Sequence, residues 1–132
     1  MQIAILYVTS MAFFLVVDAI VLNAFMKQLF MRHVASLMRS PFDMAPAAVF
    51  YLFYVAGVIW LISWPALQNE SIFQAALGGT LLGALAYGTY EFTNKATLKG
   101  WQWSMVAIDT TWGALLTGST AAFGVWATLL LA

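Results

Sequence analysis

The sequence predicts an all-α integral membrane protein whose four transmembrane helices form a compact bundle. Of its 132 residues, 64% are hydrophobic and 8% are charged, whereas soluble domains contain about 25% charged residues. Four apolar runs each reach the length of about 20 residues that a helix needs to cross the hydrocarbon layer. All basic residues lie in two short polar stretches between these runs. We therefore expect one membrane domain that covers residues 1–132.

The four predicted spans follow one another with unequal connections. They cover residues 3–26, 46–65, 72–92 and 103–131. The first run has no basic residues before it and is interrupted by Asp18, which favours a retained helix over a cleaved signal peptide. Pro46 suits the first turn of the second span, and Pro65 suits its last turn. The fourth run is long enough to tilt in the membrane.

The first connection, residues 27–45, has a helical pattern of its own. Apolar side chains recur at helical spacing there, at Phe30, Val34, Leu37 and Met38. This pattern predicts a short helix on the inner membrane surface that ends at Ser40-Pro41, with its basic side chains toward the lipid headgroups. A solvated irregular loop is the alternative.

The basic residues predict the orientation of the chain. They are grouped in the first and third connections: Lys27, Arg32, Arg39, Lys95 and Lys99. Short connections rich in Lys and Arg stay in the cytoplasm. Because two spans separate these connections, both lie on one side, so we expect the N- and C-termini on the outer side.

Two acidic residues, Asp18 and Asp109, lie inside apolar runs, where a carboxylate costs roughly 2.5–3.5 kcal/mol. Their separations from Lys27 and Lys99 place both at a similar depth, about 13–15 Å inside the membrane at about 1.5 Å per residue. No Lys or Arg lies within a span. Each acid is therefore protonated, shares a proton or an ion with the other, or accepts hydrogen bonds from other helices.

The interpretation favoured for Asp18 and Asp109 is a hydrogen-bonded clasp between spans one and four, because the outer half of the membrane has no acid to continue a relay. A proton or cation relay is the alternative. Glu91 precedes Lys95 by one helical turn, in the order that favours an ion pair. The candidate donors to the acids are Asn23, Tyr54, Tyr87, Tyr90, Thr110, Thr111 and Trp112. The predicted polar cluster comprises Asp18, Asp109, Glu91, Asn94, Tyr87 and Trp112.

Small residues predict how the last two spans pack. In lipid, close backbone approach and interhelical hydrogen bonds drive helix association. Gly79 and Gly83 are four residues apart on the third span, and Gly113 and Gly118 lie among other small residues on the fourth. We expect these glycines to form the contact between the two spans.

The segment from Tyr87 to Leu98 (YGTYEFTNKATL), followed by Trp101 and by Asp109-x-x-Trp112-Gly113, resembles a family of small bacterial four-helix inner-membrane proteins catalogued as a domain of unknown function. Glu91 stands where that family more often has Asp, and Val21 where a Trp commonly follows the first-span acid. The resemblance implies the bacterial inner membrane and no particular activity. Near the end of span three, we expect Asn94 and Thr97 to cap the helix rather than to bind a ligand.

Composition excludes several functional classes. The chain has no cysteine and a single histidine, His33, so a metal centre, a haem pair or a nucleophile–base pair is not expected. Its net charge is zero and no basic patch is large enough for nucleic acid. We expect a protein that is not an enzyme and holds no cofactor.

Abundant apolar and aromatic helix surface favours a structural or accessory subunit that docks onto a larger membrane assembly, of respiratory or photosynthetic type, or that self-associates in the bilayer. One alternative is a small proton- or cation-coupled carrier that uses Asp18 and Asp109. A second is a lipid- or quinone-handling protein with an inner-leaflet crevice lined by Trp112, Tyr87, Tyr90 and Glu91.

Overall fold

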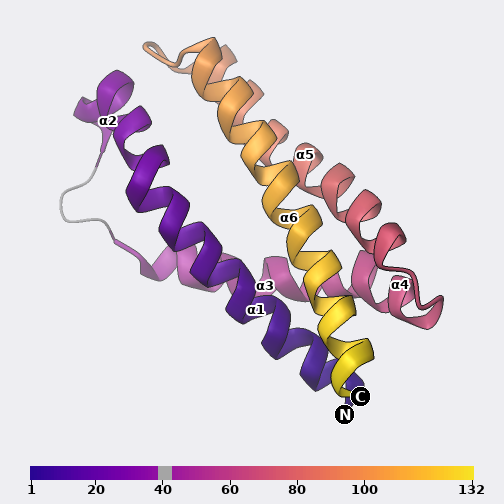
Figure 1. The fold of residues 1–132 in the computed structure, drawn as a ribbon. Coiled ribbons are helices and arrows are strands. Elements are labelled where there is room, and N and C mark those ends of the chain that lie inside the picture. The colour runs from indigo at the N-terminus through magenta and orange to yellow at the C-terminus, as the bar shows by residue number, and fades with distance from the viewer. Residues whose placement is uncertain (39–42) are drawn as a thin grey trace.

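The computed structural model describes residues 1–38 and 43–132, almost all of them helical (Figure 1). Four helical segments are long and apolar enough to cross a membrane, which confirms the predicted fold class. They are Gln2–Leu37, Ala45–Gln68, Ile72–Thr97 and Trp103–Leu131. The first three extend beyond their predicted ends, because the flanking polar residues continue the helices instead of ending them.

The first segment joins α1 (Gln2–Val21) to α2 (Lys27–Val34) through a π-helical turn, η1 (Leu22–Met26), and ends in a 3-10 turn, η2 (Ala35–Leu37). The predicted helix in this connection is present as α2, but it continues directly from the first span instead of forming a separate helix (Figure 1). Neither Gly nor Pro interrupts this stretch. The predicted end at Ser40-Pro41 and the basic residue Arg39 lie outside the described residues.

The second segment comprises α3 (Ala45–Val58), a π-helical turn η3 (Ile59–Ser63) and α4 (Trp64–Gln68). Pro46 lies in the first turn of α3, as predicted. Pro65 instead lies at the start of α4, so the helix continues past the position where the sequence predicted its end. A proline ring clashes with the carbonyl four residues earlier in a regular α-helix, and the π-helical turn just before Pro65 is the kind of local adjustment that relieves this clash.

The third and fourth segments are α5 (Ile72–Thr97) and α6 (Trp103–Leu131), which run side by side in Figure 1. Ser71 caps α5, because its hydroxyl accepts a hydrogen bond of 3.0 Å from the backbone N–H of Gln74. The connection to α6 turns at Gly100, whose φ of 82° is a left-handed conformation that glycine adopts without strain.

The predicted glycines form the contact between α5 and α6. A Cβ atom on Gly83 would overlap the backbone carbonyl of Gly113, and one on Gly79 would lie 2.8 Å from the backbone oxygen of Thr117. Cβ atoms on the two α6 glycines would overlap α5 side chains, the ring of Tyr87 for Gly113 and the hydroxyl of Thr80 for Gly118. These close approaches place all four glycines in the contact between α5 and α6.

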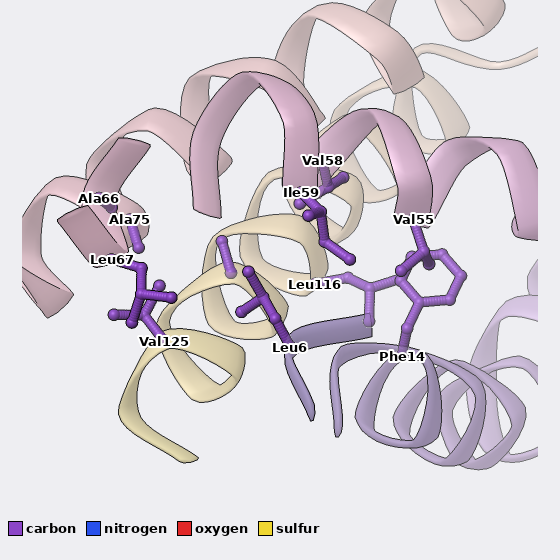
Figure 2. Packing of buried hydrophobic residues seen from close by; sticks show 11 residues of the cluster. Leu6, Phe14, Val55, Val58, Ile59, Ala66, Leu67, Ala75, Leu116 and Val125 are labelled. Carbon is purple, nitrogen blue, oxygen red and sulfur yellow. The ribbon is translucent and has the colours of Figure 1, made fainter. Parts of the chain in front are cut away.

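The second segment crosses the others instead of running alongside them, from α1 past α6 to α5 (Figure 1). Its central residues, Val55, Val58 and Ile59, pack against Leu6 and Phe14 of α1 and Leu116 of α6 (Figure 2). The contacts of α5 with this segment come mainly from η3 and α4. The first half of α3 and the second half of α5 therefore diverge, and a cavity lies between them.

Candidate functional site

Asp18 joins three helices through its carboxylate. The hydroxyl of Tyr51 on α3 donates to Oδ2 at 3.0 Å, and the indole N–H of Trp112 on α6 approaches Oδ1 at 3.4 Å. Asp18 itself is half-buried on α1. Interhelical hydrogen bonds in membranes contribute about 0.6–2 kcal/mol each. This cluster therefore stabilises the crossing of α1, α3 and α6, and it compensates part of the cost of placing a carboxyl group at this depth.

Glu91 and Asp109 form a second cluster between α5 and α6. Glu91 is fully buried, and its Oε1 accepts a hydrogen bond of 2.8 Å from the indole N–H of Trp101. Its Oε2 receives no N–H or hydroxyl donor among the described residues. The carboxyl group of Asp109, which is 8% exposed, is close enough to interact electrostatically with Glu91. Two negative charges this close in a buried, low-dielectric place repel each other, so the arrangement suits a pair that holds one proton.

The predicted pairing of Glu91 with Lys95 is wrong. Glu91 points into the interface between α5 and α6, whereas the ammonium group of Lys95 lies 5.3 Å from the ring centroid of Trp103. The two residues are one helical turn apart, but Glu91 is fully buried and Lys95 is only half-buried. A neutral indole donor and a second carboxyl group replace the expected cation.

The contact between spans one and four is made by Asp18 with Trp112, one of its candidate donors, and not by Asp18 with Asp109. Asp18 reaches span four through Trp112, while Asp109 turns to Glu91 on span three. Val21 stands where the related family commonly has a Trp after the first-span acid. This chain still has a Trp–Asp interaction, because Trp112 supplies the indole from another helix.

Two residues of the clusters were missed by reasoning from the sequence. Tyr51 was absent from the candidate donors, although the Phe50-Tyr51-x-x-Tyr54 run supplies two phenols at helical spacing. Trp101 was also absent from the candidate donors, yet it is buried against Glu91. The sequence feature that could have indicated this contact is the position of Trp101, ten residues after Glu91 and just past the turn at Gly100.

A cavity of about 610 Å³ lies between α3 and α5, and the carboxyl group of Asp109 contributes to its wall. Four aromatic rings surround this cavity, which we call the aromatic pocket; its lining comprises Ala47, Phe50, Tyr51, Ala86, Tyr87, Thr89, Tyr90, Thr93 and Asp109. Phe50 and Tyr90 are about half-exposed, at 52% and 50%, so they flank its opening.

The residues of the predicted polar cluster do not lie together in the structure. Asp18 and Trp112 form the first cluster, Glu91 and Asp109 form the second, and Tyr87 lines the aromatic pocket. Asn94 belongs to none of these three places. Its backbone carbonyl accepts a hydrogen bond from the N–H of Leu98 at the end of α5. Of the other candidate donors, Tyr54 bonds with Thr117 at 2.7 Å, and Asn23 donates to the backbone of Ala19. Thr110 has a buried hydroxyl without a partner among the described residues.

Further cavities flank the first span. One of about 400 Å³ includes Asp18, Asn23, Lys27 and Tyr51 in its wall, so Tyr51 separates it from the aromatic pocket. Another, of about 250 Å³, lies between α2 and α6 and includes Arg32 and His33. Among the described residues, no three His, Asp or Glu side chains are grouped as ligands of a metal ion.

The fold and the site thus define a four-span membrane protein with a half-buried acid that joins three helices, a buried pair of acids and an aromatic pocket. Residues 3–126 match the family model described as a predicted membrane protein, DUF2177. The chain belongs to this family. No curated protein and no solved structure matches the chain.

Proposed function

We propose that this protein binds an amphipathic small molecule in the aromatic pocket. The observation that carries the proposal is a single cavity that combines four aromatic rings with one buried carboxyl group. Ligand sites typically have volumes of roughly 300–1,000 Å³, apolar and aromatic walls and a few polar groups. The aromatic pocket, with a volume of about 610 Å³, has each of these properties.

The pocket lies between two helices, α3 and α5, whose exposed sides face lipid in a bilayer. Its walls come from the first half of α3 and the second half of α5, and half-exposed Phe50 and Tyr90 flank the opening. A ligand that partitions into the bilayer therefore reaches the pocket laterally, without crossing the hydrocarbon layer. This entry route favours an amphipathic molecule over a fully hydrated one.

The orientation proposed from the basic connections places the aromatic pocket in the cytoplasmic half of a bacterial inner membrane. The chain contains no cysteine, so Glu70→Cys and Lys99→Cys each create a unique label site. In intact cells, a membrane-impermeant maleimide is expected to label Glu70→Cys and to label Lys99→Cys only after lysis. The opposite pattern would reverse the orientation and move the pocket to the outer leaflet.

Filling the pocket tests ligand binding. Ala47 lines the aromatic pocket, whereas its neighbour Ala48 is exposed and outside the lining. Ala47→Trp is expected to weaken binding at least about tenfold, a loss of about 1.4 kcal/mol, because the indole occupies the space of the ligand. Ala48→Trp is the matched control and should bind as the wild type does.

Binding is measured by equilibrium dialysis in non-ionic detergent with two probes, neutral decylubiquinone and cationic tetraphenylphosphonium, against protein-free micelles. Saturable binding of either probe that Ala47→Trp removes supports the proposal. If neither probe binds saturably, or if both variants bind as the wild type does, the pocket is not the binding site.

Docking onto a larger assembly remains a prediction. Phe53, Trp60 and Phe73 are more than 70% exposed, at 74%, 79% and 76%. Lipid chains cover such side chains as well as a partner helix does, so their exposure does not favour a protein partner. The absence of an enzymatic activity likewise remains a prediction.

A further inference from the structure

The charge of the aromatic pocket points to the class of its ligand. Asp109 lies in its wall, Glu91 lies directly behind Asp109, and Asp18 is close enough to interact electrostatically with Asp109. The described lining includes no Lys, Arg or His. Ionisation of an acid in this environment leaves a negative charge in a medium of low dielectric, which a cation inside the pocket would compensate.

The aromatic rings favour the same class of ligand. Cations bind to the faces of Tyr and Phe rings with about 0.5–2 kcal/mol per contact, most strongly where water is excluded. Phe50, Tyr51, Tyr87 and Tyr90 surround the space next to Asp109. A carboxylate together with several aromatic rings is the arrangement that recognises organic ammonium and phosphonium groups.

The burial of Glu91 and Asp109 makes a proton the natural counter-charge that a cation can replace. Their carboxyl groups are 0% and 8% exposed, and Oε2 of Glu91 receives no donor among the described residues. Two neighbouring buried acids are less costly with one proton between them than with two negative charges. When a monovalent cation enters and this proton leaves to water, the total charge of the site is unchanged. The exchange avoids placing an additional net charge in the membrane interior.

We infer that the aromatic pocket takes a lipophilic organic monocation and binds it in exchange for the proton shared by Glu91 and Asp109. This inference rests on the proposed function, since it assigns the chemical class of the ligand in the same pocket. It also accounts for the acids: those on α5 and α6 exchange a proton, while Asp18 holds the helices around the pocket together.

Groups on every neighbouring helix face this pair. Tyr87 and Tyr90 lie on α5, Tyr51 on α3 and Asp18 on α1. Trp101 donates to Glu91 from the connection before α6. The basic residues of α2, Arg32 and His33, lie in the separate cavity between α2 and α6, and Lys95 lies over Trp103. The exchanged proton is assigned to the pair and not to Asp18, because Asp18 already accepts hydrogen bonds from Tyr51 and Trp112.

The test compares tetraphenylphosphonium with the neutral triphenylphosphine oxide, using the purified full-length protein in non-ionic detergent. Cation affinity is expected to weaken by about tenfold for each unit that the pH falls, in the range where one proton competes with one cation. Binding in weakly buffered solution is expected to release protons, which a pH indicator dye reports. The affinity of the neutral probe should not depend on pH.

Two variants assign the exchange to the pair. Asp109→Asn is expected to reduce cation affinity by at least about tenfold and to leave neutral-probe binding unaltered. In Glu91→Gln, the amide oxygen still accepts from Trp101 while its NH₂ group donates to Asp109, so the pair needs no proton. Cation binding to Glu91→Gln is therefore expected to release none.

The outcomes separate this inference from the proposed function. Pocket-dependent binding of the neutral probe, with no preference for the cation, overturns the inference and leaves the proposed function standing. Cation binding that releases no proton and is independent of pH in the wild type also overturns it, without recourse to a variant. Failure of both probes to bind saturably overturns both proposals.

Discussion

Gly83→Ala is expected to lower the free energy of unfolding by about 2–3 kcal/mol, because the added methyl group overpacks the contact between α5 and α6. The atoms it would meet belong to the backbone carbonyl of Gly113, which cannot rotate away as a side chain does. Separating the two helices to make room also weakens the contacts of Gly79 and Gly118 along the same interface. Titration with sodium dodecyl sulfate in mixed micelles, followed by tryptophan fluorescence, measures the change.

Gly57→Ala is the matched control for this substitution. A Cβ atom at Gly57 meets no heavy atom within 4 Å among the described residues, although Gly57 also lies within a transmembrane helix. Removing a helical glycine there should raise stability by up to about 1 kcal/mol, because alanine has the better helix propensity. Equal effects of the two substitutions would contradict the proposed close contact of α5 with α6.

Trp101→Phe is expected to destabilise the protein by about 2–3 kcal/mol, because it removes the indole donor from a fully buried carboxyl group. The phenyl ring retains most of the apolar surface, so the loss reports mainly the hydrogen bond to Glu91. The same detergent titration measures it. Trp60→Phe, at a position that is 79% exposed, is the control and should change stability by less than about 0.5 kcal/mol.

A double-mutant cycle distinguishes lost packing from the lost hydrogen bond. In a Glu91→Met background, which has no carboxyl group to satisfy, Trp101→Phe should cost at least about 1 kcal/mol less than it does in the wild type. An unchanged cost would mean that Trp101 stabilises the protein through packing alone.

The two predictions concern the same structural element. The glycine contact holds α5 against α6, and this proximity brings Glu91 to Asp109 and Trp101. Asp109 then contributes to the wall of the aromatic pocket from α6, although the other lining residues come from α3 and α5. Close helix packing is therefore a precondition for the proposed exchange of a cation for a proton.

The membrane class, the number of spans and the packing glycines could be predicted from the sequence. Each depends on local information: the length of an apolar run, the rarity of charge, or small residues at four-residue spacing. The buried acids could also be located, because a carboxyl group inside an apolar run is conspicuous wherever the run lies. Their similar depth in the membrane is a prediction that rests on helix rise alone.

The partners of those acids were decided by the tertiary structure. Donation from Tyr51 and Trp112 to Asp18, from Trp101 to Glu91, and the pocket beside Asp109 all depend on how the helices rotate and cross. In a soluble protein, a polar stripe on each helix indicates its rotation. These helices are apolar on nearly every face because lipid surrounds them. Their sequence therefore indicates that they span the membrane but not which face of each helix turns toward its neighbours. That rotation is decided by the packing of side chains in the tertiary structure.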